Sequence, residues 1–114
     1  MKLTIAAFAL FSLGSLIASA GQLTGYISDT KCAAENAKAA KASDWIHPKV
    51  FESCAQMCVK GGSEAIFLTE DNKVVKFDAD SKSKALAHLG HKVTVNGKIE
   101  NGVLKIDSID TVNW

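Results

Sequence analysis

The stretch Lys92–Ile106, KVTVNGKIENGVLKI, decides the fold class because it has the pattern of two strands joined by a tight turn. In its first half, valine and isoleucine alternate with polar residues, which is the two-residue period of a half-buried strand. Gly97 falls on the inward side, where a strand often bends. Asn101-Gly102 is a strong signal for a two-residue hairpin turn. The stretch therefore predicts an antiparallel hairpin.

The second strand of this hairpin changes phase before it ends. Leu104 and Ile106 continue the inward face, whereas the next apolar residue is Ile109. A β-bulge adds one residue to a strand and so accounts for such a slip. We expect a bulge near Asp107-Ser108.

Toward the N-terminus, the same reasoning predicts three more strands and three helices. The strands are expected at residues 22–29, 64–69 and 73–77, with a turn at 70–72. The helices are expected at residues 30–42, 48–60 and 81–89. Asp29 or Thr30 can cap the first helix, Pro48 suits the first turn of the second, and Gly61-Gly62 stops it. The apolar and sulfur-bearing side chains expected to share one face of the second helix are Val50, Phe51, Cys54, Met57 and Cys58.

The order of elements predicts a mostly β chain of the α+β class. A two-helix insert at about residues 30–62 separates strands 1 and 2, and a short helix separates strands 3 and 4. Without the insert, this is the element order of an OB-like five-stranded barrel. An open antiparallel sheet with helices on one face fits the same elements, because periodicity does not reveal closure.

Residues 1–20 have the pattern of a cleavable secretory signal peptide. Lys2 supplies a positive start, the residues from Leu3 to Ile17 are almost all apolar, and small residues lead to an expected cleavage between Ala20 and Gly21. The apolar run is shorter than the about 20 residues that a membrane span needs. We therefore expect a secreted or periplasmic protein whose single OB-like domain comprises residues 21–114.

The charge balance argues against nucleic acid as a partner. The chain has 13 Lys and Arg residues against 12 Asp and Glu, and every one of its basic residues is lysine. Removing Lys2 with the signal peptide leaves 12 of each sign. Nucleic-acid binding relies on excess positive charge and on arginine. We also find no Ser/His/Asp order, no glycine-rich phosphate loop and no carboxylate pair, so no enzyme activity is expected.

All three cysteines lie in the long segment between the first two strands. In an oxidising compartment, a disulfide from Cys32 to Cys54 or to Cys58 is the default expectation. Closing a loop of about 25 residues would contribute roughly 3–4 kcal/mol. The remaining thiol would be buried, reactive, or able to link an otherwise monomeric protein into a dimer.

A metal site is the alternative use of the same cysteines. Three thiolates from Cys32, Cys54 and Cys58, with the imidazole of His47, would suit zinc or copper(I). A thiol-redox role has less support, because the chain has no Cys-x-x-Cys motif. His88 and His91 bracket the end of the helix expected at residues 81–89, and its carbonyl end favours a histidine there.

Four segments of the chain resemble a family of small secreted bacterial proteins of unknown function with an OB-like fold. They are Gly25–Asp29 followed by Cys32, Cys54–Gly62 (CAQMCVKGG), Lys73–Phe77 and Gly90–Lys98. The resemblance covers essentially the whole chain after residue 20 and implies the fold and export, but no activity. Members often carry a histidine four residues after the first cysteine, where this chain has Asn36, so a fourth ligand would come from His47.

Together these features favour a small exported binding module for a small ligand or an envelope protein, stapled by a disulfide. Tyr26 and Trp45 are its candidate ligand-face residues, because aromatic rings beside the insert can stack on a ligand. The second hypothesis is the metal-binding or thiol-redox protein, with zinc or copper as its metal. The third is a structural envelope protein without a ligand.

Overall fold

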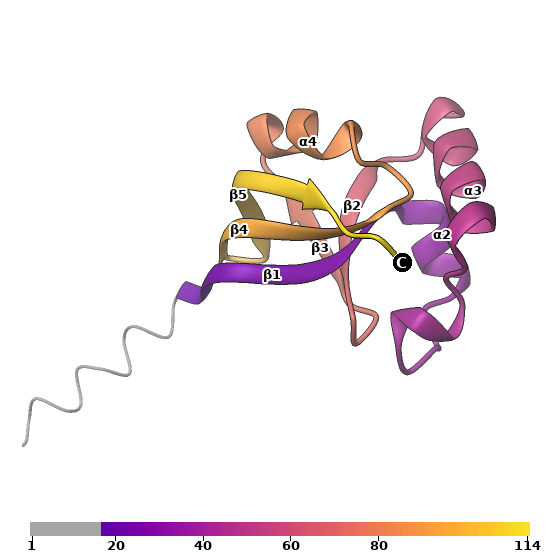
Figure 1. Ribbon diagram of the computed structural model, residues 1–114, viewed down its shortest axis with the longest axis horizontal. Helices are drawn as coiled ribbons and strands as arrows, with labels where there is room; N and C mark the ends of the chain where they lie inside the picture. The colour runs from indigo at the N-terminus through magenta and orange to yellow at the C-terminus, as the bar shows by residue number, and fades with distance from the viewer. Residues whose placement is uncertain (1–16) are drawn as a thin grey trace, which may run out of the picture.

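The protein is a five-stranded sheet that closes on itself, with helices packed on its outside (Figure 1). Its structure is a computed structural model that describes residues 17–114, with side chains from Gly21 onward. The strands are β1 Ile17–Asp29, β2 Ala65–Thr69, β3 Val74–Phe77, β4 Lys92–Glu100 and β5 Val103–Thr111. The helices are α2 Thr30–Glu35, the 3-10 turn η2 Ala42–Asp44, α3 Pro48–Lys60 and α4 Ala79–Leu86.

The strands follow one another around the ring in the order β1-β2-β3-β5-β4. Neighbouring strands are antiparallel, except β3 and β5, which run parallel. The long strand β1 pairs with β2 near its end and with β4 along most of its length. The predicted mostly β class with helical elements is therefore confirmed, and the open-sheet alternative is wrong.

Both predicted hairpin turns form where the sequence places them. Asn101 and Gly102 have φ of 54° and 78°, the left-handed pair that a two-residue hairpin turn requires. Asn72, in the turn between β2 and β3, has a φ of 63°. Asparagine tolerates this conformation better than most residues, so each turn has suitable residues.

The predicted bulge is also present. Asn96 lies opposite Ser108, whereas its neighbour Gly97 lies opposite Ile106. Asp107 is therefore the additional residue on β5. The bulge returns Ile109 to the inward side, where it packs against the cluster that contains Ile106, as the phase slip indicated.

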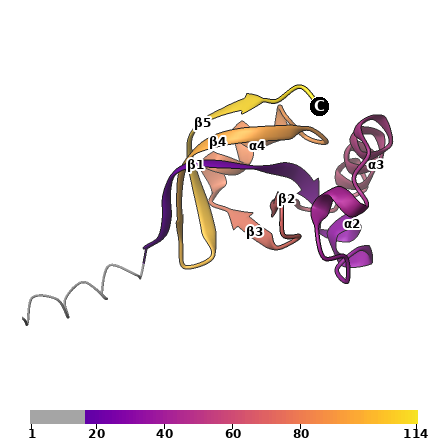
Figure 2. The same cartoon turned by 60° about the horizontal axis from the view of Figure 1, so that its bottom comes forward.

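Two hydrophobic clusters lie on opposite sides of β1. Ile27 points into the ring, whereas its neighbour Tyr26 points outward beneath the helical insert. The buried members of the cluster inside the ring include Phe67, Val93, Val95 and Leu104. The second cluster joins the insert to β1 and β2; its buried members include Ala33, Ile46, Phe51, Ile66 and Leu68. Figure 2 shows α2 and α3 together at one end of the sheet.

The first helix is shorter than predicted, because α2 ends at Glu35 rather than near residue 42. The Asn36 side chain donates to the Cys32 carbonyl (2.9 Å). The Asn72 amide, from the β2–β3 turn, donates to the carbonyls of Asn36 (2.9 Å) and Ala39 (3.0 Å). These bonds hold the segment in a non-helical path, so a tertiary contact overrides its high helix propensity.

The second helix has the predicted ends but not the predicted face. α3 begins at Pro48 and ends before Gly61. Phe51 is buried, whereas Val50 and Met57 are 71% and 70% exposed. The expected common face is therefore wrong, and the helix packs on the rest of the protein through Phe51 and Ala55 instead.

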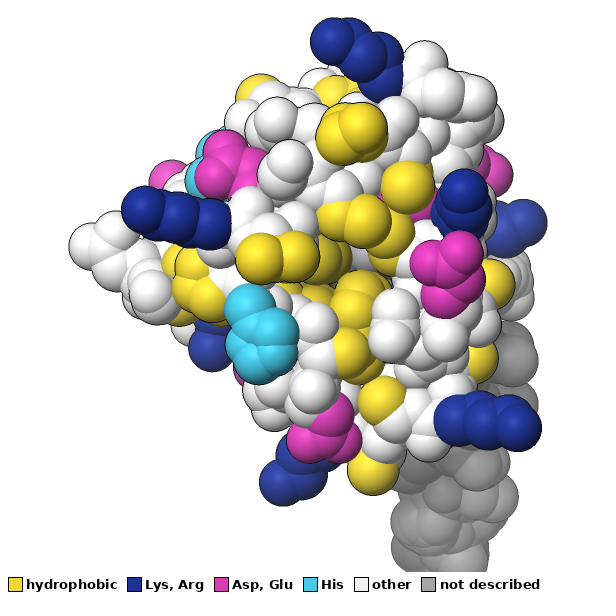
Figure 3. Space-filling model, turned by 90° about the vertical axis from the view of Figure 1, so that its right-hand side faces the viewer, with side chains coloured by type: hydrophobic (Ala, Val, Ile, Leu, Met, Phe, Trp, Pro, Cys, Tyr) yellow, Lys and Arg dark blue, Asp and Glu magenta, His cyan; other side chains and the backbone are white. Residues whose placement is uncertain are grey.

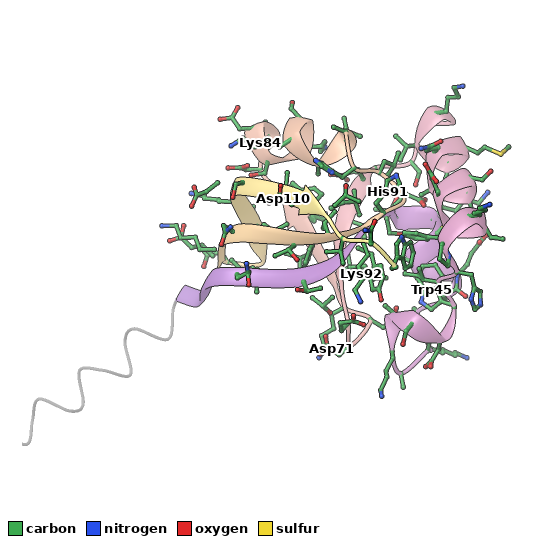
Figure 4. The ribbon with its side chains drawn as sticks, viewed as in Figure 1. Trp45, Asp71, Lys84, His91, Lys92 and Asp110 are labelled. Atoms are coloured by element: carbon green, nitrogen blue, oxygen red, sulfur yellow. The ribbon has the colours of Figure 1, made fainter. Side chains whose placement is uncertain are left out.

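Close backbone packing holds α3 against the ring. A Cβ atom on Gly90 would lie 2.5 Å from the Cα atom of Glu52 in α3. Gly90 also has a φ of +84°, and its N–H donates to the Ile27 carbonyl (2.8 Å). Beside it, His91 Nε2 lies 3.2 Å from the Glu52 carboxylate, and Figure 4 places His91 between the sheet and α3. The distance between α3 and the ring thus depends on a glycine at position 90.

The predicted signal peptide comprises residues 1–20. Of these, residues 1–16 lie outside the described part of the chain. β1 begins at Ile17, so its first four residues belong to the expected leader. β1 also pairs with β4 from Gly21 to Tyr26. Most of this pairing therefore lies after residues 17–20. Among residues 17–114, no helix is both long enough and apolar enough to cross a membrane.

Replacing Gly90 with alanine is expected to destabilise the fold by about 2–5 kcal/mol. The substitution combines a left-handed backbone, which costs about 1–2 kcal/mol, with overpacking against α3 of about 1–3 kcal/mol. Gly102→Ala is the matched control, because Gly102 has a similar φ of +78° and open space around it. Urea denaturation of both variants measures the difference. Equal losses in the two variants would show that α3 does not pack on Gly90 as described.

Candidate metal centre

The three cysteines meet between the two helices of the insert. Cys32 lies in α2, while Cys54 and Cys58 lie one turn apart on α3, a spacing that puts both on one side of the helix. The Cys32 sulfur is 3.2 Å from that of Cys54 and 3.8 Å from that of Cys58. All three sulfurs lie within 4.8 Å of one another, which is a spacing that one metal ion can bridge.

The predicted disulfide is absent from the structure, in which all three cysteines are free. The shortest sulfur–sulfur distance, 3.2 Å between Cys32 and Cys54, exceeds the bond length of about 2.05 Å. The structure nevertheless brings together the cysteines that the disulfide prediction named. Cys32 is in contact with both of its expected partners.

His47 is not part of this group. Its side chain is exposed at the N-cap of α3, seven residues before Cys54 in the sequence. Within residues 17–114, the ligating atoms that gather within 4.8 Å of one another here are the three cysteine sulfurs. The fourth ligand that sequence reasoning assigned to His47 is therefore not in place.

The three thiols differ in their access to solvent. Cys32 is buried, Cys58 is half-buried and Cys54 is exposed. A pocket of about 180 Å³ opens onto Cys32 and Cys54; its other lining residues are Glu35, Asn36, Trp45, Val50 and Phe51. A wider depression on the other side includes Lys31, Met57 and Cys58. Figure 3, which looks onto this end of the molecule, shows hydrophobic side chains gathered around a hollow. A small ion or reagent can thus reach the cluster from solvent.

Asp29 is the residue at this site that sequence reasoning treated only as a helix cap. It ends β1, is fully buried, and caps α2 as predicted. Its Oδ2 atom accepts hydrogen bonds from the backbone N–H groups of Lys31 (3.0 Å) and Cys32 (3.2 Å). The Ser63 hydroxyl donates to the same oxygen (2.8 Å). These bonds set the position of Cys32 relative to the end of β1.

Burial and the nearby carboxylate favour the protonated thiols of Cys32 and Cys58. Burial raises the pKa of the Cys32 thiol well above its ordinary value, and the nearby Asp29 carboxylate raises it further. The pKa of Cys58 is also raised, chiefly by burial. A thiolate ligand forms only when the proton leaves, so a metal ion binding here would displace protons.

The two candidate ligand-face residues have different positions. Tyr26 is only 2% exposed, and its hydroxyl donates to Glu70 at 3.3 Å. Burial and Glu70 raise its pKa to about 12. Trp45 is half-buried, lines the 180 Å³ pocket, and donates from Nε1 to Asn72 (2.9 Å); Figure 4 shows it at the helical end. Trp45 thus borders the cavity beside the cysteines, whereas Tyr26 is a core residue.

His88 and His91 have partners of their own. His88 Nδ1 lies 2.8 Å from the Thr111 hydroxyl, and His91 pairs with Glu52. Neither histidine contributes a nitrogen to the group of sulfurs. Comparisons of the chain with protein-family models, with curated proteins and with solved structures find no match.

Alkylation of the reduced, metal-free protein is expected to modify Cys54 first, Cys58 next and Cys32 last. Cys54 is exposed, whereas Cys32 is buried and its pKa is raised, and only the thiolate reacts rapidly. Because raised pKa values leave little thiolate at neutral pH, the rate at Cys58 should increase as the pH rises. Peptide mass spectrometry after timed labelling measures the order. Modification of Cys32 before Cys54 would contradict the geometry.

Proposed function

We propose that this chain is a small exported protein that binds one thiophilic metal ion, zinc(II) or copper(I), through Cys32, Cys54 and Cys58. The observation that carries the proposal is the meeting of three sulfurs within 4.8 Å. Thiolates are soft ligands that select zinc and copper(I) over magnesium or calcium. The proposal turns the second hypothesis from the sequence into the leading one.

The distances suit one ion shared by the three sulfurs. Ligands held about 2.3 Å from a tetrahedral zinc ion lie roughly 3.8 Å from one another. Cys32 and Cys58 already have this spacing, at 3.8 Å. Cys54, at 3.2 Å from Cys32, needs to move outward by a few tenths of an ångström, and its exposed position leaves room for that.

An OB-like fold would favour a metal site in the helical insert between β1 and β2. The ring order, the parallel β3–β5 pair and the helix α4 between β3 and β4 agree with a five-stranded Greek-key barrel. In such barrels, the connection between the first two strands borders the binding face. Here that connection contains all three cysteines.

A disulfide between Cys32 and Cys54 is the second candidate state of the same site. Their sulfurs are the closest pair, at 3.2 Å, and an oxidising compartment would favour the bond. It would staple α2 to α3 and leave Cys58 free. The two states exclude each other, because a disulfide removes two of the three thiolates.

The reduced protein is expected to bind one equivalent of zinc(II) or copper(I). Replacing any one of the three cysteines by serine should weaken binding by more than about 100-fold, which exceeds the usual cost of losing a supporting residue. Ser53→Ala, beside Cys54 on the exposed side of α3, is the matched control and should bind normally. Competition titration against a chromophoric chelator measures affinity, and native mass spectrometry measures stoichiometry.

The thiol count of the protein as isolated distinguishes the two states. Intact mass after alkylation without prior reduction should give no modification in the metal-bound protein and three alkylated thiols after the metal is chelated. A single alkylated thiol, with no metal by elemental analysis, would favour the disulfide and overturn the metal proposal. In that case Cys32→Ser should lower the stability by a few kcal/mol.

Export rests on the pattern of residues 1–20 and has its own test. When the full chain is expressed in a Gram-negative bacterium, the periplasmic protein should begin at Gly21. Ala20→Lys places a long charged side chain at the cleavage position, and the precursor should accumulate. Processing at another site, or retention of the wild-type chain in the cytosol, would contradict the proposal.

A further inference from the structure

Cys54 borders two hollows on the surface of the helical insert. The 180 Å³ pocket has Cys54, Trp45 and Phe51 among its lining residues. A second depression is lined in part by Cys54, Val50 and Met57. A molecule whose reactive atom meets the Cys54 sulfur therefore has a hollow available for each of two substituents.

The smaller hollow has the size and the lining for one aromatic ring. Trp45 and Phe51 meet edge to face, with ring centroids 6.0 Å apart. The Trp45 indole is held by its hydrogen bond to Asn72 (2.9 Å). An apolar cavity of about 150 Å³ binds benzene, and this pocket measures about 180 Å³. Glu35 also lines it and disfavours an anionic occupant.

Cys32 lies within reach of the Cys54 sulfur and borders the same pocket. The two sulfurs are 3.2 Å apart. Cys54 is exposed and Cys32 is buried, so a reagent from solvent meets Cys54 first. Once that reagent is bonded to Cys54, Cys32 can attack within the same molecule, and intramolecular attack has an effective concentration far above that of a free thiol. The pair thus has the arrangement of an attacking thiol and a resolving thiol.

The geometry points to a thiol–disulfide exchange activity of the metal-free protein toward small disulfides that carry an uncharged aromatic or apolar group. Cys54 is the attacking thiol and Cys32 is the resolving thiol. This activity goes beyond the proposed metal binding, because it uses the same sulfurs in covalent chemistry and needs no metal. A metal ion held by the three sulfurs would block it.

The reaction is a pair of exchange steps in which the small disulfide is the oxidant. In the first step the Cys54 sulfur attacks one sulfur of the substrate, a mixed disulfide forms, the substrate S–S bond breaks, and the first thiol leaves with the proton from Cys54. In the second step Cys32 attacks the Cys54 sulfur, the Cys32–Cys54 bond forms, and the second thiol leaves with the proton from Cys32. The protein loses two electrons and two protons, which convert the substrate into two thiols.

Dithiodipyridine, a neutral aromatic disulfide whose released thiol is coloured, is the probe for this activity. Cys58→Ser removes the third thiol, so that released thiol can be counted in the reduced, metal-free protein. This variant should release two thiols for each disulfide consumed, and peptide mapping should find a Cys32–Cys54 bond. Adding Cys32→Ser should halve the release and leave a lasting mixed disulfide on Cys54. Adding Cys54→Ser instead should abolish the fast first release, because Cys32 is buried.

The pocket has its own test, in the preference for dithiodipyridine over oxidised glutathione, which is larger and anionic. Trp45→Ala should lower the ratio of the two rates by about 2–10-fold, the range expected for loss of one aromatic contact. Val50→Ser is the second variant and should lower the same ratio, since Val50 lines both hollows and is 71% exposed, which leaves the fold intact. Ser53→Ala, beside Cys54 on α3, is the matched control and should keep both rates.

The outcomes separate this inference from the proposed function. A lasting mixed disulfide while Cys32 is present, or a first adduct of the wild type on Cys58, would overturn the exchange activity even in a protein that binds zinc(II). An unchanged rate ratio in folded Trp45→Ala and Val50→Ser, checked by circular dichroism, would overturn the assigned substrate class. A protein that binds neither zinc(II) nor copper(I) but gives the expected exchange would lose the proposed function alone and support this inference.

Discussion

The hydrogen bonds of the buried Asp29 carboxylate join three parts of the chain where the ring meets the helical insert. Its Oδ2 atom is bonded to the first turn of α2 and to Ser63, just before β2. Close by, the Thr30 N–H donates to the Glu64 carbonyl (2.9 Å). The path from β1 into α2, and with it the position of Cys32, follows from these bonds. A carboxylate can be buried here because charge-assisted bonds to N–H and O–H donors offset part of its desolvation.

The other two thiols are positioned by an independent constraint, the docking of α3 on the ring. Gly90 allows the backbone of α3 to approach closely at Glu52. Phe51 and Ala55 are buried beneath the helix, and Tyr26 and Trp114 pack against Phe51 with ring centroids 6.1 and 6.2 Å away. The sulfurs meet because both helices are fastened to the same ring. Figure 2 shows the two helices at the same end of the sheet. A change in either attachment would separate Cys32 from the pair on α3.

Local signals in the sequence predicted most of the elements and failed where distant residues intervened. The hairpin at Asn101-Gly102, the bulge at Asp107 and the ends of α3 were all predictable, because each depends on neighbouring residues alone. The first helix was predicted too long, since the Asn72 amide that binds the carbonyls after α2 comes from a turn some thirty residues away in the sequence. Tyr26 alternates like a surface residue, yet the insert covers that face of β1.

By itself, the sequence determined the strands, the turns and the caps. It also identified Cys32, Cys54 and Cys58 as the residues able to form a disulfide or bind a metal ion. These are properties of short segments, whose hydrophobic period and backbone preferences are local. The tertiary structure decided that the sheet closes and that three sulfurs meet without His47. These features depend on pairing and burial between residues far apart in the chain, which no local pattern records.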